Sequence, residues 1–160
     1  MVMIVLSLLF LSTLLRAETD PLCTEIYGGM YNPDKLFTIV NRSAELAELD
    51  PMLIVAVIHI ESSWNICAVS SKGAIGLMQI TLPTAKIFDP YITQLELFDP
   101  YVNINIGSLY LGALVKYYGN IYNALLAYNA GPRRAHYPQE AHRYALKVIG
   151  VYKKLRRRYE

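Results

Sequence analysis

Residues 50–65 have the sequence DPMLIVAVIHIESSWN, an apolar segment with a helix-start signal before it and an acid near its end. Asp50 can cap the free N–H groups of a helix, and Pro51 fits the first helical position. Leu53 to Ile60 are apolar apart from one histidine, and a helix that is apolar on nearly every face lies in a core. A buried strand would have a similar composition, but the Asp-Pro start and the lack of hairpin signals nearby favour a core helix.

This predicted core helix ends in Glu61, where the chain enters the polar residues SSWN. Partial burial disfavours a carboxylate and raises its pKa. An acid with a raised pKa can hold a proton near neutral pH and donate it to a leaving oxygen. The alternative is a residue at the helix end turned to water, although an acid there opposes the helix dipole. The local pattern leaves both interpretations open.

Start and stop signals predict a series of further helices, so the expected fold is mainly α. One long loop is expected from Ser63 to about Ile80. The predicted helices begin at Asn32-Pro33, at Asp50-Pro51, at Asp99-Pro100 with a stop at Gly119, at Asn120 with a stop near Gly131-Pro132, and at Pro138 with an end near Arg157, and a short turn of helix follows Pro83.

The long loop contains the glycine-rich sequence KGAIGLMQI at residues 72–80. Gly73 and Gly76 allow backbone conformations or close approaches that side chains would block. Gln79 offers a donor and an acceptor, as sugar hydroxyl and acetamide groups require. A packing loop is the alternative, and a phosphate loop is excluded because no Gly-Lys-Ser/Thr ending is present.

The sequence AYNAGP at residues 127–132 places a Tyr and an Asn at a sharp helix end. A helix terminus explains Gly131 and Pro132, but it leaves Tyr128 and Asn129 unexplained. A tyrosine can stack on a sugar face or hydrogen-bond a carboxyl group.

The N-terminal fifteen residues, MVMIVLSLLFLSTLL, carry no charged side chain. The run is shorter than the ~20 residues that span a bilayer, and it fits a secretory signal cleaved after Ala17. No Lys or Arg precedes the run, so an uncleaved membrane anchor is the alternative. We therefore expect a signal peptide at residues 1–17 and one domain at residues 18–160.

Two cysteines, Cys23 and Cys67, remain after this signal. An even number in an exported chain predicts a disulfide between them, and two buried thiols are the alternative. His59, His136 and His142 show no zinc-ligand spacing with the cysteines, so no metal is expected.

The charge of the chain gives nucleic-acid binding no support. Removal of residues 1–17 takes away one of the 15 basic side chains, Arg16, and leaves 14 against 13 acidic ones. The local exception is KKLRRR at residues 153–158. It fits a solvated helix end, since basic residues suit the last turns of a helix; attraction to an anionic envelope surface or a partner is the alternative.

Taken together, these residues resemble the lytic transglycosylase family whose founding member is the soluble lytic transglycosylase. The similarity covers about residues 33–155, and three motifs in the family's order are highly specific. The matching motifs are Glu61-Ser62 in IESSWN, Gly76-Leu77-Met78-Gln79 in GAIGLMQI, the AYNAGP of residues 127–132 and, more weakly, Glu140 with Tyr144 in PQEAHRYALKVIGVY. One departure is Thr81-Leu82-Pro83, where many relatives have Met-Pro; it puts a cleft contact at Thr81 in doubt.

The resemblance implies a lysozyme-like fold and cleavage of the β-1,4 bond between N-acetylmuramic acid and N-acetylglucosamine, with a 1,6-anhydromuramyl product. It implies that Glu61 is the sole catalytic acid/base. The residues that it places at the substrate are Ser70, Gln79, Tyr128, which supports the catalytic carboxyl group, Asn129 and Glu140. No cofactor is expected. The chain is expected to be a periplasmic monomer that binds peptidoglycan glycan strands.

Small relatives of this kind often accompany secretion, conjugation or pilus machines, which predicts a role in local wall opening. The alternative enzyme is a goose-type muramidase, which uses water as the nucleophile. A glycan-binding assembly factor without activity is a further alternative, against which the presence of Glu61, Gln79 and Tyr128 together argues. A membrane-active protein that uses the basic tail is a third.

Overall fold

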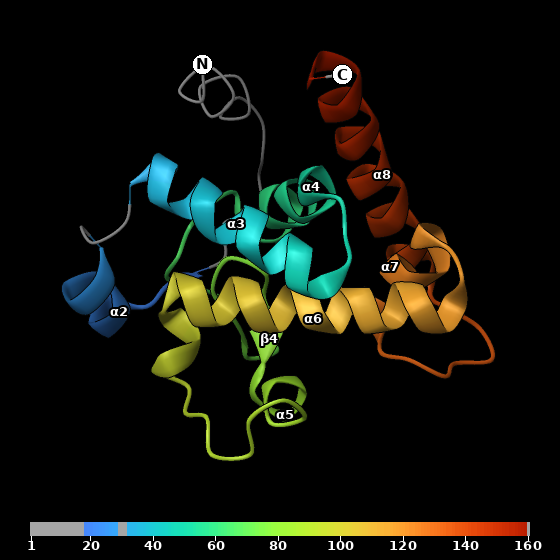
Figure 1. Ribbon diagram of the computed structural model, residues 1–160. Coiled ribbons are helices and arrows are strands. Elements are labelled where there is room, and N and C mark those ends of the chain that lie inside the picture. The colour runs from blue at the N-terminus through green and yellow to red at the C-terminus, as the bar shows by residue number, and fades with distance from the viewer. Residues whose placement is uncertain (1–17, 29–31, 160) are drawn as a thin grey trace.

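The computed structural model describes residues 18–28 and 32–159, and the predicted signal peptide lies outside the described residues (Figure 1). The fold is mainly α, as predicted. The α-helices of the described residues are α2 (Pro21–Tyr27), α3 (Pro33–Ala47), α4 (Pro51–Ser62), α5 (Leu82–Ala85), α6 (Pro100–Tyr118), α7 (Ile121–Ala130) and α8 (Gln139–Tyr159), and a 3-10 helix, η1, spans Glu96–Phe98.

The predicted helix starts are confirmed by side-chain caps. Asn32 accepts a hydrogen bond from the Lys35 N–H at 2.9 Å, and Asp50 accepts one from the Met52 N–H at 2.8 Å. The caps of α6 and α7 are Asp99 and Asn120. Each cap satisfies N–H groups that have no partner within the helix, so the first residue of each helix is fixed by a local interaction.

Helix α4 is the centre of the core, and the strand alternative for this segment is wrong. Every residue from Leu53 to Ile58 is buried. Helix α4 packs against α3 and α8, while α6 runs across the molecule in contact with α3 and α7 (Figure 1). Helix α8 also contacts α7, so α4 packs against an element that is distant in sequence and is itself joined to α7.

The sequence predicted one long loop after α4, and this prediction is wrong because the segment contains three short strands. Strands β2 (Ala68–Val69), β3 (Ala74–Ile75) and β4 (Ile80–Thr81) form an antiparallel sheet in the order β1-β2-β3-β4, in which β1 (Glu18–Thr19) pairs with β2. Strands of two residues are too short to show an alternating pattern. The loop is therefore a small folded lobe beside the helices.

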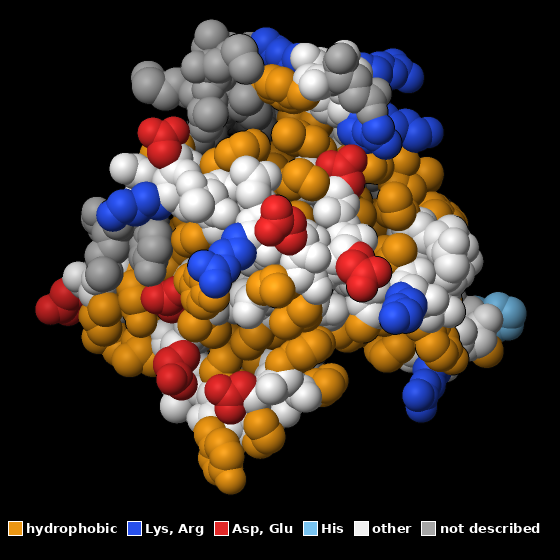
Figure 2. All heavy atoms as spheres, viewed as in Figure 1, with side chains coloured by type: hydrophobic (Ala, Val, Ile, Leu, Met, Phe, Trp, Pro, Cys, Tyr) orange, Lys and Arg blue, Asp and Glu red, His pale blue; other side chains and the backbone are white. Residues whose placement is uncertain are grey.

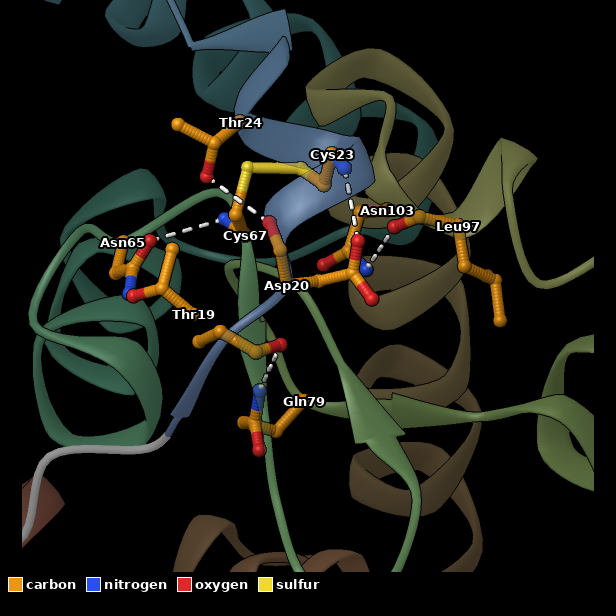
Figure 3. The surroundings of a disulfide bond; sticks show 10 residues. Thr19, Asp20, Cys23, Thr24, Asn65, Cys67, Gln79, Leu97 and Asn103 are labelled. Atoms are coloured by element: carbon orange, nitrogen blue, oxygen red, sulfur yellow. Dashed lines mark hydrogen bonds between the residues drawn. A yellow bond between two sulfur atoms is a disulfide. The ribbon is translucent and has the colours of Figure 1, made fainter. Parts of the chain in front are cut away.

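A disulfide between Cys23 and Cys67 joins α2 to this lobe, as predicted (Figure 3). Both cysteines are buried. The backbone N–H of Asp20 donates to the carbonyl oxygen of Cys67 at 2.9 Å, and the Asp20 side chain caps α2 at the Cys23 N–H. The covalent bond and these hydrogen bonds fix the N-terminal segment on the sheet.

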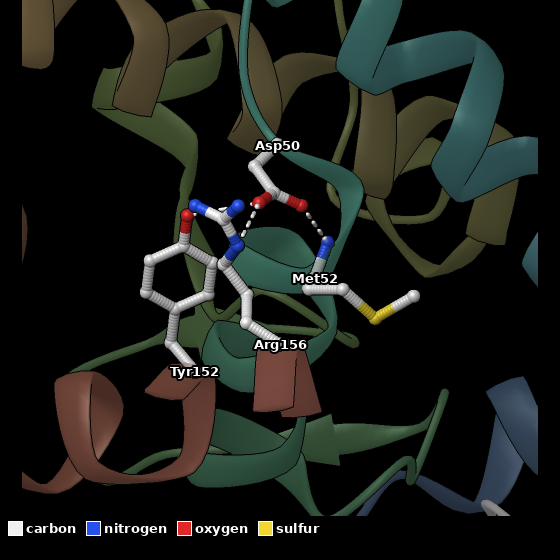
Figure 4. Close-up of polar contacts among 4 residues, drawn as sticks. All are labelled: Asp50, Met52, Tyr152 and Arg156. Atoms are coloured by element: carbon white, nitrogen blue, oxygen red, sulfur yellow. Dashed lines mark hydrogen bonds and ion pairs between the residues drawn. The ribbon is translucent and has the colours of Figure 1, made fainter. Parts of the chain in front are cut away.

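Helix α8 is held against the start of α4 by Asp50 (Figure 4). The Tyr152 hydroxyl donates to Asp50 Oδ2 at 2.9 Å, and Arg156 Nε lies 3.5 Å from the same oxygen. The other basic residues of the 153–158 cluster are exposed, and Figure 2 shows Lys and Arg side chains gathered over this end of α8. In the described ranges no helix has the length and apolarity to cross a membrane.

Candidate active site

The candidate site is built around Glu61, in the last turn of α4. Its residue surface is only partly exposed. Burial raises the pKa of Glu61 from 4.5 to about 7. The hydroxyl group of Tyr144 acts in the opposite direction, and its effect is smaller than that of burial. The prediction of a raised pKa is confirmed, and the alternative of a carboxyl group turned to bulk water is wrong. A carboxyl group with this pKa can hold a proton near neutral pH.

Tyr144, on α8, presents a buried hydroxyl group to Glu61. Within the described residues, this hydroxyl has no hydrogen-bond partner of ordinary geometry. Burial raises the pKa of Tyr144 well above its usual value, and the neighbouring Glu61 carboxyl group raises it further. In return, the Tyr144 hydroxyl lowers the pKa of Glu61. Tyr144 and Glu61 are therefore close enough for each to change the pKa of the other.

Tyr128, on α7, is the second tyrosine beside Glu61. Burial, followed by the charge of Glu61, raises the pKa of Tyr128 well above its usual value. Its hydroxyl donates to the carbonyl oxygen of Met78 at 2.9 Å. The ring of Tyr110, on α6, packs against the Tyr128 ring with centroids 5.4 Å apart. Tyr128 thus joins the helix that carries it to the glycine-rich segment.

The glycine-rich segment is held in place by Asn103, a fully buried residue of α6. Asn103 Oδ1 accepts from the Met78 N–H at 2.8 Å, and Nδ2 donates to the carbonyl oxygens of Ile75 at 2.9 Å and Leu97 at 2.8 Å. Gly76 has φ +74°, and a Cβ there would lie 2.5 Å from Asn103 Nδ2. The close approach therefore requires glycine at position 76.

Ser62 connects the same segment to the residue next to Glu61. Its hydroxyl donates to the carbonyl oxygen of Leu77 at 2.9 Å, and the Ile58 carbonyl oxygen at 3.2 Å shares this proton. With the Tyr128–Met78 bond, this contact joins the three sequence motifs. The segments predicted to lie together are therefore in direct contact.

Gln79 has a different arrangement from the one expected. Its backbone has φ +51°, and its Nε2 atom donates to the carbonyl oxygens of Gly76 at 3.0 Å and Ala68 at 3.2 Å. A primary amide has two N–H donors, so both are used within the loop. In this arrangement Oε1 is the polar atom of the Gln79 side chain that can accept a hydrogen bond from a ligand, and a role for Gln79 at the substrate stays a prediction.

Of the other predicted substrate residues, Ser70 is bonded within its own turn, and Asn129 and Glu140 lie at the surface. Ser70 Oγ accepts from the Ala74 N–H at 3.0 Å and the Lys72 N–H at 3.3 Å, so it closes the turn between β2 and β3. Asn129 and Glu140 are exposed. In the part of the chain that the structure describes, neither of them contributes to the pKa of Glu61.

The sequence interpretation missed Asn103, Tyr110 and the position of Tyr144. Asn103 had a usable signal, because an Asn inside an apolar helix is buried only with its polar atoms bonded. Tyr144 belongs to the weaker match, PQEAHRYALKVIGVY. Nothing in that motif indicates that Tyr144 lies beside Glu61. Among the described residues, no group of three or more His, Cys, Asp or Glu side chains could hold a metal ion.

The model of the "Transglycosylase SLT domain" matches residues 38–147. The chain is 37% identical over 112 residues to the transglycosylase of Enterobacteria phage PRD1, covering 70% of this chain and 40% of the relative. It also resembles Membrane-bound lytic murein transglycosylase C of Yersinia enterocolitica, with 37% identity over 114 residues, 61% of this chain and 31% of the relative. The chain spans less than half the length of these relatives.

A solved structure with the same fold is an inactive variant of the lytic transglycosylase Slt from Pseudomonas aeruginosa. It has a TM-score of 0.64 and 27% identity, and the match covers 85% of this chain and 28% of that one. The match to the family covers more than half of the chain and includes Glu61, Gln79 and Tyr128. The chain therefore belongs to the transglycosylase SLT domain family.

Proposed function

We propose that the protein is a peptidoglycan lytic transglycosylase that cuts the bond between N-acetylmuramic acid and N-acetylglucosamine and leaves a 1,6-anhydromuramyl end. The observation that carries this proposal is a single acid, Glu61, whose pKa is raised to about 7 by burial. Across the described ranges, no second carboxyl group contributes to that pKa. Glycosidases of the usual kind need two carboxyl groups across the bond.

A single acid is sufficient if the nucleophile belongs to the substrate. Protonated Glu61 gives its proton to the glycosidic oxygen, and the bond from C1 of the muramic acid to that oxygen breaks. The N-acetyl group of the substrate stabilises the positive charge at C1. Ionised Glu61 then takes the proton from the C6 hydroxyl group, whose oxygen bonds to C1. The acid returns to its starting state, and no water is consumed.

The intramolecular attack is favoured because a well-oriented group has a large effective concentration. The segment that would face the sugar is fixed by Asn103, Ser62 and Tyr128. We propose that Gln79 Oε1, the remaining polar atom of that side chain, accepts a hydrogen bond from an acetamide N–H of the glycan. Substrate contacts by Ser70, Asn129 and Glu140 stay predictions.

The relatives support the same chemistry. The curated relatives are named transglycosylases, several of them murein transglycosylases. The Pseudomonas structure is that of an inactive variant in which a glutamate is replaced by glutamine. A periplasmic location, a monomeric state and a role in opening the wall for a secretion, conjugation or pilus machine stay predictions.

The products released from purified peptidoglycan sacculi test this proposal. We expect wild-type protein to release muropeptides with anhydro ends, detected by mass spectrometry. Glu61→Gln should keep the fold and lose about 100-fold or more of this activity, the range of acid–base catalysis. Glu45→Gln, a change of an exposed acid on α3, is the matched control and should be fully active.

Two outcomes separate the alternatives. Reducing ends, with one water added per cut, would make the protein a muramidase of goose type. No release by wild-type protein that still binds sacculi would make it a glycan-binding factor. Unchanged turnover by the Glu61→Gln variant would remove Glu61 from the catalytic role.

A further inference from the structure

We propose that the outer face of α8 binds the anionic headgroups of a membrane surface and holds the folded domain beside the lipid. This basic face of α8 consists of six exposed side chains, Arg143, Lys147, Lys153, Lys154, Arg157 and Arg158. The sequence left two interpretations of the cluster at residues 153–158, a solvated helix end and attraction to an anionic surface or a partner. The inference goes beyond the proposed function and does not depend on it.

The charges of the chain are strongly separated along the sequence. Residues 18–99 carry 11 acidic and 4 basic side chains, whereas residues 100–160 carry 2 acidic and 10 basic ones. Within α8, residues 141–159 include seven Lys or Arg and no Asp or Glu. A basic surface of this kind attracts anions even when the protein as a whole is nearly neutral. The small net charge of the chain therefore conceals a local basic surface.

Helix α8 holds these charges on the side that faces away from the protein. Its buried residues are Ala141, Tyr144, Ala145, Val148 and Leu155. They share one side of the helix, because residues three, four and seven positions apart lie on the same face. The basic face takes the opposite side, where the exposed positions without a charge are Leu146 and Gly150. From residue 143 to residue 158 this face is about 22 Å long.

The charges of the basic face are available to a partner. Within the described residues, none of its six side chains forms an ion pair, and the pair that α8 does form uses a different residue, Arg156, with Asp50 at 3.5 Å. The buried Leu155 and the hydrogen bond from Tyr152 to Asp50 hold this end of the helix on the body (Figure 4). Binding therefore does not require the helix to become ordered, which would weaken it.

The shape of the basic face fits a plane of charges rather than a small ligand. Small ligands are bound in concave sites, whereas this face lies on the outside of a helix whose C-terminal end stands beyond the body (Figures 1 and 2). About four to eight Lys and Arg side chains on an amphipathic helix are typical of binding to anionic lipids. Export, predicted from residues 1–17, would bring the folded chain to the outer side of a membrane.

Docking through the basic face leaves the candidate active site open. Tyr152 and Arg156 contact Asp50, which precedes the first residue of α4, whereas Glu61 lies in its last turn. These two ends are about 16 Å apart along the helix. The glycine-rich segment is joined to Ser62, so it lies at the end that carries Glu61. A protein held at a membrane by the basic face would therefore still accept a glycan strand.

Partition onto lipid vesicles tests the inference. The full chain is mixed with vesicles of phosphatidylglycerol and phosphatidylcholine in equal parts, or of phosphatidylcholine alone, and the bound fraction is measured by sedimentation over a range of lipid concentrations. Residues 1–17 contribute equally to both, so the ratio of the two partition coefficients reports the part that depends on charge. We expect partition onto the anionic vesicles to be about 100-fold stronger at low salt, and this preference to fall as salt screens the charges.

Two variants with the same net charge locate the binding surface. The variant of the basic face combines Lys153→Gln, Lys154→Gln, Arg157→Gln and Arg158→Gln, and it leaves Arg156 with Asp50. The control removes four exposed basic side chains elsewhere and combines Lys35→Gln, Arg42→Gln, Lys86→Gln and Lys116→Gln. We expect the first to lose about 100-fold in partition onto anionic vesicles and the control to lose less than about 3-fold. If the first does not fold, Lys153→Gln with Lys154→Gln replaces it, with a loss of about 10-fold.

The outcomes that overturn the inference are separate from those that overturn the proposed function. Equal losses in the two fourfold variants, or a wild type without preference for anionic vesicles, would exclude a lipid-binding face on α8. Binding to purified sacculi, which contain no lipid, tests the other anionic surface. If the variant of the basic face loses only its binding to sacculi, the face binds wall anions and the inference is wrong. A wild type that prefers anionic vesicles but releases no muropeptides would remove the proposed function and keep this inference.

Discussion

Helix α4 carries a carboxyl group at each end, and both groups meet helix α8, but their surroundings differ. Asp50, at the N-terminal end, accepts hydrogen bonds from the Met52 N–H and the Tyr152 hydroxyl and pairs with Arg156. Glu61, at the C-terminal end, has its pKa raised by burial and meets the hydroxyl of Tyr144. The helix dipole favours the first charge and opposes the second.

This difference separates a carboxylate that holds the fold together from an acid that can carry out chemistry. Two hydrogen-bond donors and a cation hold Asp50 in place, which stabilises the junction of α4 and α8. Burial makes the charge of Glu61 unfavourable in the folded state, so its proton is available near pH 7. Functional sites are expected to reduce stability in this way. The two ends should therefore respond to mutation with opposite signs.

The largest expected change in stability is a gain from Glu61→Gln at alkaline pH. The pKa of Glu61 is 4.5 when unperturbed and about 7 in the folded protein, so the folded state binds the proton more tightly. Its contribution to stability is complete below about pH 4.5 and is lost as pH rises through about 7. Gln is neutral at every pH. The variant should exceed wild type by roughly 3 kcal/mol at pH 8.5, and by much less at pH 4.5.

Urea unfolding at the two pH values measures this difference. Glu45→Gln, which changes an exposed acid on α3, should follow wild type at both. A Glu61→Gln variant that tracks the wild-type pH dependence would show that burial of residue 61 carries no unfavourable charge, and the contrast between the two ends of α4 would disappear.

At the other end of α4, Asp50→Ala should destabilise the protein by about 2 kcal/mol at pH 7, because a helix cap and the contacts to α8 are both lost. Asp50→Asn is the matched variant. Asn is an equally good cap, so it should lose less than half as much. Activity per folded molecule should stay unchanged in both, as measured by release from sacculi. An equal loss for Ala and Asn would assign the effect to charge rather than capping.

The helices could be predicted because their ends are encoded locally. Asp50-Pro51 and Asp99-Pro100 each combine a cap with a residue that fits the first turn, and the structure begins α4 and α6 at these prolines. The raised pKa of Glu61 was one of two interpretations that the sequence left open, because an apolar helix leading to an acid favours burial but does not exclude a side chain turned to water. Both inferences use residues that are close together in the sequence.

The remainder of the site depends on contacts between distant segments. Tyr144 is 83 positions after Glu61 and reaches it through the packing of α8 on α4. The two donors of Gln79 are used by Ala68 and Gly76 because β2 and β3 turn back beside it. Strands of two residues leave no period in the sequence, so neither the lobe nor this use of Gln79 could be foreseen.

The smallest predicted change concerns one hydrogen bond of the Asp50 junction. Tyr152→Phe removes the hydroxyl that donates to Asp50 Oδ2 at 2.9 Å while the cap and the Arg156 contact remain. We expect a loss of about 1 kcal/mol in urea unfolding, the net value of a single hydrogen bond. Tyr91→Phe, in which the tyrosine is 90% exposed, is the control and should match wild type. If Tyr152→Phe also matches wild type, Arg156 and the cap alone hold Asp50, and the junction stabilises the fold through charge rather than through the phenol.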